Sequence, residues 1–173
     1  MIISTAYAGF ANHFLKALAS RPRGLQEGFS ILSLFRLRRM DDCMNRTFTI
    51  DGGRISDIPS FYAEINRVFM ADEDWKLGAS LDALNDLLYG GIGAINGAES
   101  IRLIWREMEK SRAALGFEVT RQFYLAKLRQ PERFDAARIA ADLRELENGA
   151  GQTYFEIILE IIADHPNIEL IAG

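Results

Sequence analysis

The sequence predicts an α/β fold in which a small, three-stranded parallel sheet is covered by helices. Three short runs rich in β-branched and aromatic residues predict the strands, at 47–51, 101–105 and 167–171. Segments with helical periodicity separate these runs, and strands that alternate with helices are typical of a parallel sheet. Of the 173 residues, 49% are hydrophobic and 25% are charged, which is normal for a globular domain with one core.

The first helix is predicted to follow the strand at 47–51 after a turn at Gly52 and Gly53. Asp57 and Pro59 favour its start, because aspartate caps a helix and proline fits the first turn. Residues at helical spacing form its predicted apolar face: Ile58, Phe61, Ile65, Val68 and Phe69.

Helices are also predicted over 106–115 and 117–128, and another is predicted to begin at Pro131 and end at Gly149. The inward residues of the latter are predicted to be Ala136, Ile139, Ala140, Leu143 and Leu146. The last helix is predicted to begin at Thr153, since Thr153 and Glu156 have the spacing of a capping box.

The helix predicted within 80–90 has two different faces. Leu81, Leu84 and Leu88 recur at helical spacing and form an apolar stripe. A second stripe consists of Asp82, Asn85, Asp86 and Tyr89. No Lys or Arg occurs between residues 76 and 102, so the two aspartates have no cation nearby in the sequence. We expect Ser80 to cap this helix and Gly90 to end it, and we expect the acidic stripe to suit a basic partner.

Three further acids, Glu156, Glu160 and Asp164, are spaced one turn apart on the last helix, and no Lys or Arg follows Arg144. Alone, such a row of acids is most simply a solvated face. Together with the stripe at 82–89 it can instead form the second half of one acidic surface.

Charge divides the chain into two parts. Residues 1–44 hold six Lys/Arg and three Asp/Glu, whereas residues 45–173 hold fourteen Lys/Arg and twenty-one Asp/Glu. The first part is predicted to be a basic extension without fixed structure, or alternatively a basic arm for a membrane or a partner. The second part is predicted to be the domain, and its acidic balance disfavours direct binding to nucleic acid.

Several function classes find little support. One cysteine, Cys43, and two histidines exclude a disulfide framework and a Cys- or His-rich metal site, and no cofactor is predicted. The loop at 90–97 lacks the spacing of a dinucleotide fingerprint, and no nucleophile–base pair marks an enzyme. We interpret His165 and Trp105 as structural residues, and Trp75 as either a packing residue or an exposed anchor. No apolar run is long enough for a membrane span, and no signal peptide is evident, so a cytoplasmic protein is expected.

The segments Leu81-Asp82-Ala83-Leu84-Asn85-Asp86 and Trp105-Arg106-Glu107-Met108-Glu109-Lys110-Ser111 resemble the barstar family of ribonuclease inhibitors. The resemblance covers 47–115 and 149–172, and leaves 116–148 as a helical insertion. It implies a three-stranded parallel sheet with helices packed on it. It also implies that a helix and the loop before it block the active site of a small basic ribonuclease.

The resemblance also assigns roles to individual residues. Asp86 would take the place of a substrate phosphate, Asp82 would flank it, and Glu160 and Asp164 would supply a second acidic contact. The remaining contact residues would be Trp75, Asn85, Tyr89, Gly90 and Gly91. Asn85, Tyr89 and Gly91 depart from the best-known family pattern, which has Trp, Thr and Trp at these places. The sequence therefore predicts an inhibitor of a small basic ribonuclease, or alternatively a module of the same fold that binds a basic protein other than a nuclease. A hydrolase has the weakest support.

Overall fold

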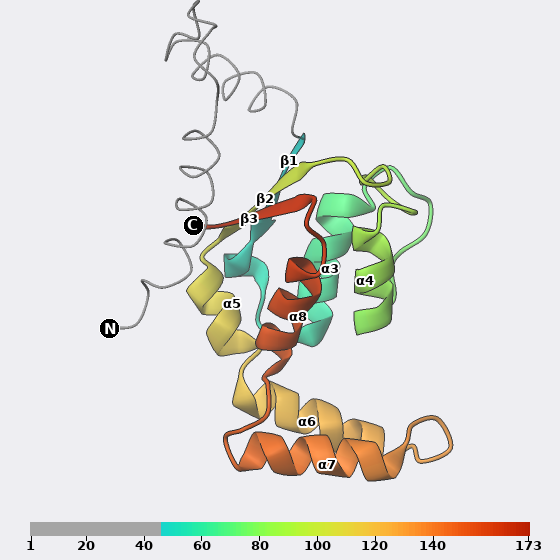
Figure 1. Ribbon diagram of the computed structural model, residues 1–173, viewed down its shortest axis with the longest axis vertical. Helices are drawn as coiled ribbons and strands as arrows, with labels where there is room; N and C mark the ends of the chain where they lie inside the picture. The colour runs from blue at the N-terminus through green and yellow to red at the C-terminus, as the bar shows by residue number, and fades with distance from the viewer. Residues whose placement is uncertain (1–45) are drawn as a thin grey trace, which may run out of the picture. The chain divides into compact units, whose positions relative to one another are not determined.

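A computed structural model describes residues 46–173, and the expectations for residues 1–44 lie outside the described residues. The described part contains three strands, one short 3₁₀ helix and six α-helices (Figure 1). In chain order they are β1 (Arg46–Asp51), η1 (Gly52–Arg54), α3 (Ile58–Phe69), α4 (Leu81–Leu88), β2 (Ile101–Arg106), α5 (Met108–Ala114), α6 (Phe117–Leu128), α7 (Ala136–Glu147), α8 (Tyr154–Ala163) and β3 (Ile168–Ala172).

The strands form one open parallel sheet in the order β1-β2-β3. Arg46 of β1 is in register with Ile101 of β2, which is in turn in register with Ile168 of β3. Helices α3, α4 and α8 lie on one side of the sheet (Figure 1). The predicted α/β class, with a three-stranded parallel sheet covered by helices, is confirmed.

The core lies between the sheet and these helices and is centred on Trp105 of β2. The indole ring lies 6.0 Å from the ring of Phe61 in α3 and 5.5 Å from that of Phe155 in α8. Its Nε1–H donates a hydrogen bond of 2.9 Å to the hydroxyl of Ser111 in α5. Trp105 is fully buried, as expected of a structural residue, and its one polar group is satisfied.

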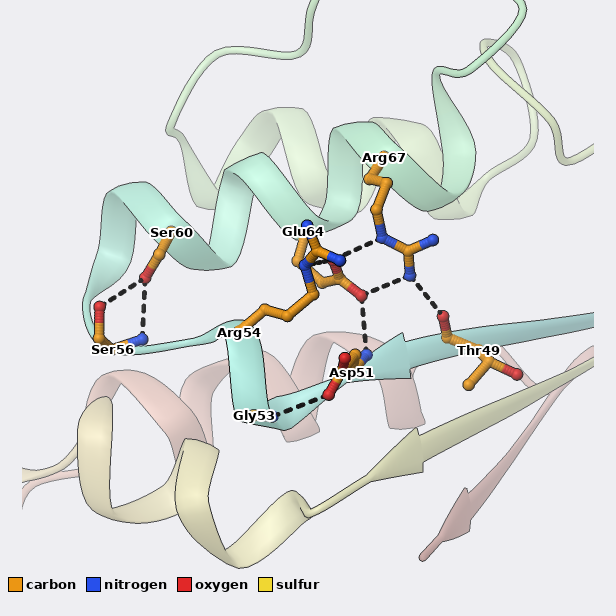
Figure 2. A network of polar contacts seen from close by, with 8 residues as sticks. All are labelled: Thr49, Asp51, Gly53, Arg54, Ser56, Ser60, Glu64 and Arg67. Carbon is orange, nitrogen blue, oxygen red and sulfur yellow. Dashed lines mark hydrogen bonds and ion pairs between the residues drawn. The ribbon is translucent and has the colours of Figure 1, made fainter.

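A buried carboxylate joins α3 to the first strand (Figure 2). Glu64 accepts hydrogen bonds from Nε and Nη2 of Arg67, at 2.7 and 2.6 Å, and from the backbone N–H of Asp51, at 2.8 Å. The Nε atom of Arg54 lies 3.5 Å from the same carboxylate. Burial acts to raise the pKa of Glu64, but the hydrogen bonds and the two guanidinium charges outweigh it and lower the pKa.

Helices α6 and α7 form an antiparallel hairpin that projects beyond the sheet-and-helix body (Figure 1). Tyr124, Ile139 and Leu146 form a small separate core between them. At the base of the hairpin, the hydroxyl of Thr120 accepts a hydrogen bond of 2.7 Å from the backbone N–H of Tyr154. This bond satisfies one of the free N–H groups at the start of α8 and anchors the hairpin there.

The predicted start of α7 at Pro131 is wrong. The helix begins at Ala136, because the carboxylate of Asp135 accepts hydrogen bonds from the N–H groups of Ala137 and Arg138 and caps it. Pro131 lies in the turn between α6 and α7. Of the predicted inward residues of α7, Ile139 and Leu146 are buried, whereas Ala136, Ala140 and Leu143 are half-buried.

Candidate functional site

Helix α4 separates its apolar and polar side chains as predicted. Leu84 and Leu88 are buried, together with Leu87, which lies outside the predicted stripe. On the opposite face Asp82, Asp86 and Tyr89 are exposed, and Asn85 is half-buried. Ser80 occupies the N-cap position but, contrary to expectation, makes no hydrogen bond with its side chain to the helix. The burial of the leucines therefore fixes the orientation in which the two aspartates face outward.

The acid-bearing helices α4 and α8 lie side by side (Figure 1). Glu160 of α8 and Asp164, which directly follows α8, are exposed. Glu160 accepts a hydrogen bond of 2.8 Å from the side chain of Gln152. Gln152 lines the same cleft as Asp82. The structure thus places the two acid-bearing helices next to each other.

Glu156, the first acid of the row predicted on the last helix, has hydrogen-bond partners within the chain. Its carboxylate accepts a hydrogen bond of 2.7 Å from the backbone N–H of Thr153, and the Thr153 hydroxyl accepts one from the Glu156 N–H, which confirms the predicted capping box. These hydrogen bonds to Thr153, with a smaller contribution from the charge of Arg112, lower the pKa of Glu156. Glu156 is therefore occupied by the helix cap, and Arg112, which lies far from it in the sequence, contributes a positive charge nearby.

The remaining acids of the two helices have no such partner. Among the ion pairs within residues 46–173, none includes Asp82, Asp86, Glu160 or Asp164. We name these four residues the acidic face. Because their negative charge is not neutralised by direct contact within this part of the chain, it is available to a cationic group outside it.

His165 lies behind the acidic face and joins its two helices. Its side chain is buried, with 4% exposed, directly after the end of α8. Its Nε2–H donates a hydrogen bond of 3.0 Å to Oδ1 of Asn85, and its ring meets that of Tyr89 edge to face at 4.5 Å. Tyr89 nevertheless leaves 66% of its surface exposed. His165 is therefore structural, as expected, and it positions two residues of the predicted contact surface.

Trp75 lies in the loop between α3 and α4 and is 45% exposed. The side chain of Asn66 holds this loop, since it donates to the carbonyl of Leu77 at 3.1 Å and accepts from the Leu77 N–H at 2.7 Å. Trp75 lines a cleft of about 650 Å³ between the loop and α3. Of the two interpretations of Trp75, the exposed anchor fits this position better.

Gly90 and Gly91 follow α4 and differ in their surroundings. Gly90 has φ +76°, a left-handed conformation that commonly ends a helix, and its N–H bonds to the carbonyl of Leu87 at 2.9 Å. Its carbonyl accepts from the N–H of Gly97 at 2.8 Å and closes the loop. Gly91 is exposed and a side chain there would meet no other atom within 4 Å. Gly90 thus ends the helix as expected, and Gly91 leaves an open surface beside Tyr89.

The hairpin brings cations to the start of α4 that the sequence neighbourhood does not contain. A cleft of about 790 Å³ is lined by Asp82 together with Lys127, Arg133 and Arg138 of the hairpin. The ammonium of Lys127 lies 4.3 Å from the ring centre of Phe123 and 5.0 Å from that of Phe134. Burial lowers its pKa, whereas the charges of Asp82 and Asp142 act in the opposite direction. Asp82 therefore has a cation nearby in space, although it has none nearby in sequence.

Among the described residues, no group of three or more His, Cys, Asp and Glu side chains could hold a metal ion. Residues 46–173 also contain no helix that combines the length and apolar character needed to cross a membrane. What the site offers chemically is a set of fixed carboxylates flanked by aromatic and small residues.

Comparison with known proteins supports this description at the level of the family. No curated protein matches the chain. A family model described as Barstar (barnase inhibitor) matches residues 45–165, a range that runs from β1 through the hairpin to the end of α8. The match spans well over half of the chain, and the open three-stranded parallel sheet with its helices agrees with it. The chain belongs to the barstar family.

Proposed function

We propose that this protein inhibits a small basic ribonuclease by inserting α4 and the loop before it into the enzyme's active site. The observation that carries the proposal is the acidic face: four exposed carboxylates on two adjacent helices, without an ion pair among the described residues. An enzyme that binds RNA presents a cationic pocket for phosphate. Carboxylates held on packed helices can occupy such a pocket at little cost in conformational entropy.

Within this proposal each predicted contact residue has a role. Asp86 replaces a substrate phosphate, Asp82 flanks it, and Glu160 and Asp164 form the second acidic contact. Trp75, Asn85, Tyr89, Gly90 and Gly91 complete the contact surface around them. The charges accelerate association by electrostatic steering, and the desolvated charge pairs slow dissociation.

We further propose that the protein acts in the cytoplasm and protects the cell from its own nuclease. The action requires no catalysis, cofactor, metal, membrane or direct contact with nucleic acid. In this proposal, residues 1–44 are an extension, residues 45–173 are the inhibitory domain, and residues 116–148 are a helical insertion within it.

Calorimetric titration of a small basic ribonuclease from the source cell with the Asp86→Ala variant tests the proposal. We expect a loss of about 2–5 kcal/mol of binding free energy, which is the range for removing one member of a buried interfacial charge pair. Complexes of the barstar family are among the examples behind this range. Glu109→Ala is the matched control, since it removes the same charge from an exposed position on α5. Equal affinities of the two variants would contradict the role of α4.

The alternative function is a module that uses the acidic face on a basic protein other than a nuclease. It is favoured by Asn85, which is half-buried and bonded to His165, and by Gly91, which has no side chain, because both stand where the family pattern has an aromatic ring. Affinity capture from the source cell separates the two functions. A ribonuclease among the captured proteins supports inhibition, whereas a reproducible basic partner without nuclease activity supports the alternative.

A further inference from the structure

The hairpin of α6 and α7 has an uneven distribution of charge. Residues 116–148 contain six Lys/Arg and six Asp/Glu. Four of the six cations, but only two of the six acids, fall within 127–138, at the turn that joins the two helices. We name this segment the hairpin tip. The tip is therefore cationic, whereas the rest of the hairpin and the body of the domain are acidic.

The hairpin tip borders the acidic face. Arg133 and Arg138 line the same cleft of about 790 Å³ as Asp82, and Gln152, which binds Glu160, lines it as well. Both arginines are exposed, and neither makes an ion pair within residues 46–173. Two guanidinium groups without an ion pair thus share a cleft with Asp82 of the acidic face, and Arg133 donates one hydrogen bond, of 3.2 Å, to the side chain of Gln130.

The other charged residues that line this cleft are Asp135, Asp142 and Lys127. Asp135 caps α7 through the backbone N–H groups of Ala137 and Arg138. Asp142 lies near enough to Lys127 for its charge to raise the lysine's pKa against the effect of burial. Lys127 and Asp142 are both half-buried. Apart from Asp82 and the capping Asp135, the exposed charged residues of the cleft are therefore the two arginines.

Contacts around Lys127 give the hairpin tip a fixed form. The Lys127 ammonium lies against the rings of Phe123 in α6 and Phe134 in the turn, and so joins the two sides of the hairpin. The guanidinium carbon of Arg133 lies 5.9 Å from the centre of the Phe134 ring, and its Nη1 donates a hydrogen bond of 3.2 Å to Oε1 of Gln130. A preorganised guanidinium loses less entropy when it binds a carboxylate than a free side chain does.

We propose that Arg133 and Arg138 form a second docking surface, continuous with the acidic face, that binds carboxylates of the same protein partner. This inference rests on the proposed function: the ribonuclease that accepts Asp86 in its cationic pocket would carry an acidic patch beside that pocket. A purely acidic face would attract any strongly cationic pocket. A surface that carries positive and negative charges in fixed positions selects a partner with the complementary arrangement. A partner with charges of one sign only would be repelled by part of this surface.

The test compares charge reversals on the full chain by stopped-flow association and calorimetry with the ribonuclease captured above. The double variant Arg133→Glu/Arg138→Glu should bind at least about 10-fold more weakly than wild type, mostly through slower association at low salt. Arg129→Glu is the matched control, because Arg129 is an exposed cation of the same tip that does not line the cleft. It should change the affinity by less than about 3-fold.

Folding of the double variant is not expected to fail. The cap of α7 uses the backbone N–H of Arg138 rather than its side chain, and glutamate in the first turn of a helix is favourable. Circular dichroism checks this, and the neutral variant Arg133→Gln/Arg138→Gln should give an intermediate loss of affinity.

The outcomes separate the two proposals. If Asp86→Ala weakens binding but the double variant behaves like the Arg129 control, the docking surface is wrong and the inhibitor role stands. If neither weakens binding, or no ribonuclease binds, both proposals fail. Tighter binding of the double variant would show that the cleft faces cations and would overturn the inference. Binding of a labelled RNA oligonucleotide that depends on Arg133 and Arg138 would also overturn it, in favour of a nucleic-acid site.

Discussion

Replacing Glu64 with glutamine removes the charge of the carboxylate that joins α3 to β1 while it preserves the size of the side chain. In wild type the carboxylate accepts two hydrogen bonds from Arg67 and one from the backbone N–H of Asp51, and only 1% of the side chain is exposed. Glutamine can keep an acceptor for the Asp51 N–H, but its NH₂ group then faces the guanidinium groups of Arg67 or Arg54.

The magnitude follows from these contacts. Hydrogen bonds to a charged group each contribute about 1.5–3 kcal/mol when buried. The side chains of Arg67 and Arg54 are 46% and 61% exposed. Water can therefore replace part of the interaction that their guanidinium groups lose when the carboxylate is removed. We therefore expect Glu64→Gln to lower the free energy of unfolding by about 2–3 kcal/mol near neutral pH, a large share of the stability of a small domain.

The pH dependence has a definite sign. Because the pKa of Glu64 in the folded protein lies below its ordinary value of 4.5, the unfolded chain binds the proton more readily than the folded one. The stabilisation by this carboxylate is complete well above pH 4.5 and is lost as the pH falls through the lowered pKa. The difference between wild type and Glu64→Gln should therefore be largest at neutral pH and should shrink in acid.

Urea unfolding, followed by circular dichroism at a series of pH values from 7 to 3, measures this difference. Glu109→Gln is the control, because the Glu109 side chain is 81% exposed and its one ion pair within residues 46–173 is with the neighbouring Arg112. It should have a small effect at every pH. A loss below about 0.5 kcal/mol for Glu64→Gln at pH 7, or a difference that grows as the pH falls, would refute the reasoning about this network.

Two further substitutions test the scaffold of the candidate site. His165→Ala removes the hydrogen bond to Asn85 and the ring that packs against Tyr89. It should lower the free energy of unfolding in urea by about 1–3 kcal/mol and weaken partner binding. Unchanged values would show that α4 does not depend on this contact. Gly90→Ala forces a side chain into a residue with φ +76° and against the Gly97 backbone, and should cost more than about 1 kcal/mol. Gly91→Ala, which meets open space, should change stability by less than about 0.5 kcal/mol, and equal effects at the two positions would contradict the assignment.

Local patterns predicted much of the fold because the interactions behind them are local. Asp57 caps α3, and Thr153 and Glu156 form a capping box, within a few residues of their partners. The two faces of α4 follow from helical spacing alone, since Leu84 and Leu88 must reach the core and thereby turn Asp82 and Asp86 outward. For these elements the sequence pattern and the tertiary packing favour the same structure.

What the sequence could not predict depends on contacts between distant segments. His165 and Asn85 are 80 positions apart, and no local pattern pairs them. The start of α7 was predicted at Pro131 because proline fits a first helical turn, but Asp135 provides a side-chain cap that Pro131 lacks. The absence of cations around Asp82 in the sequence gave no indication that α6 places Lys127 in the same cleft.

This last contact makes the two aspartates of α4 unequal. Lys127 already offsets part of the negative potential at Asp82, and Asp82 raises the pKa of Lys127 in return. A partner's cation at Asp82 must therefore share the carboxylate with a cation of the chain itself, and the gain in electrostatic energy on binding is reduced accordingly. Asp86 lies one turn further along the same helix, is exposed, and does not line the cleft that holds Lys127. Its charge is the more fully available of the two, which agrees with the larger role that the family resemblance assigns to Asp86.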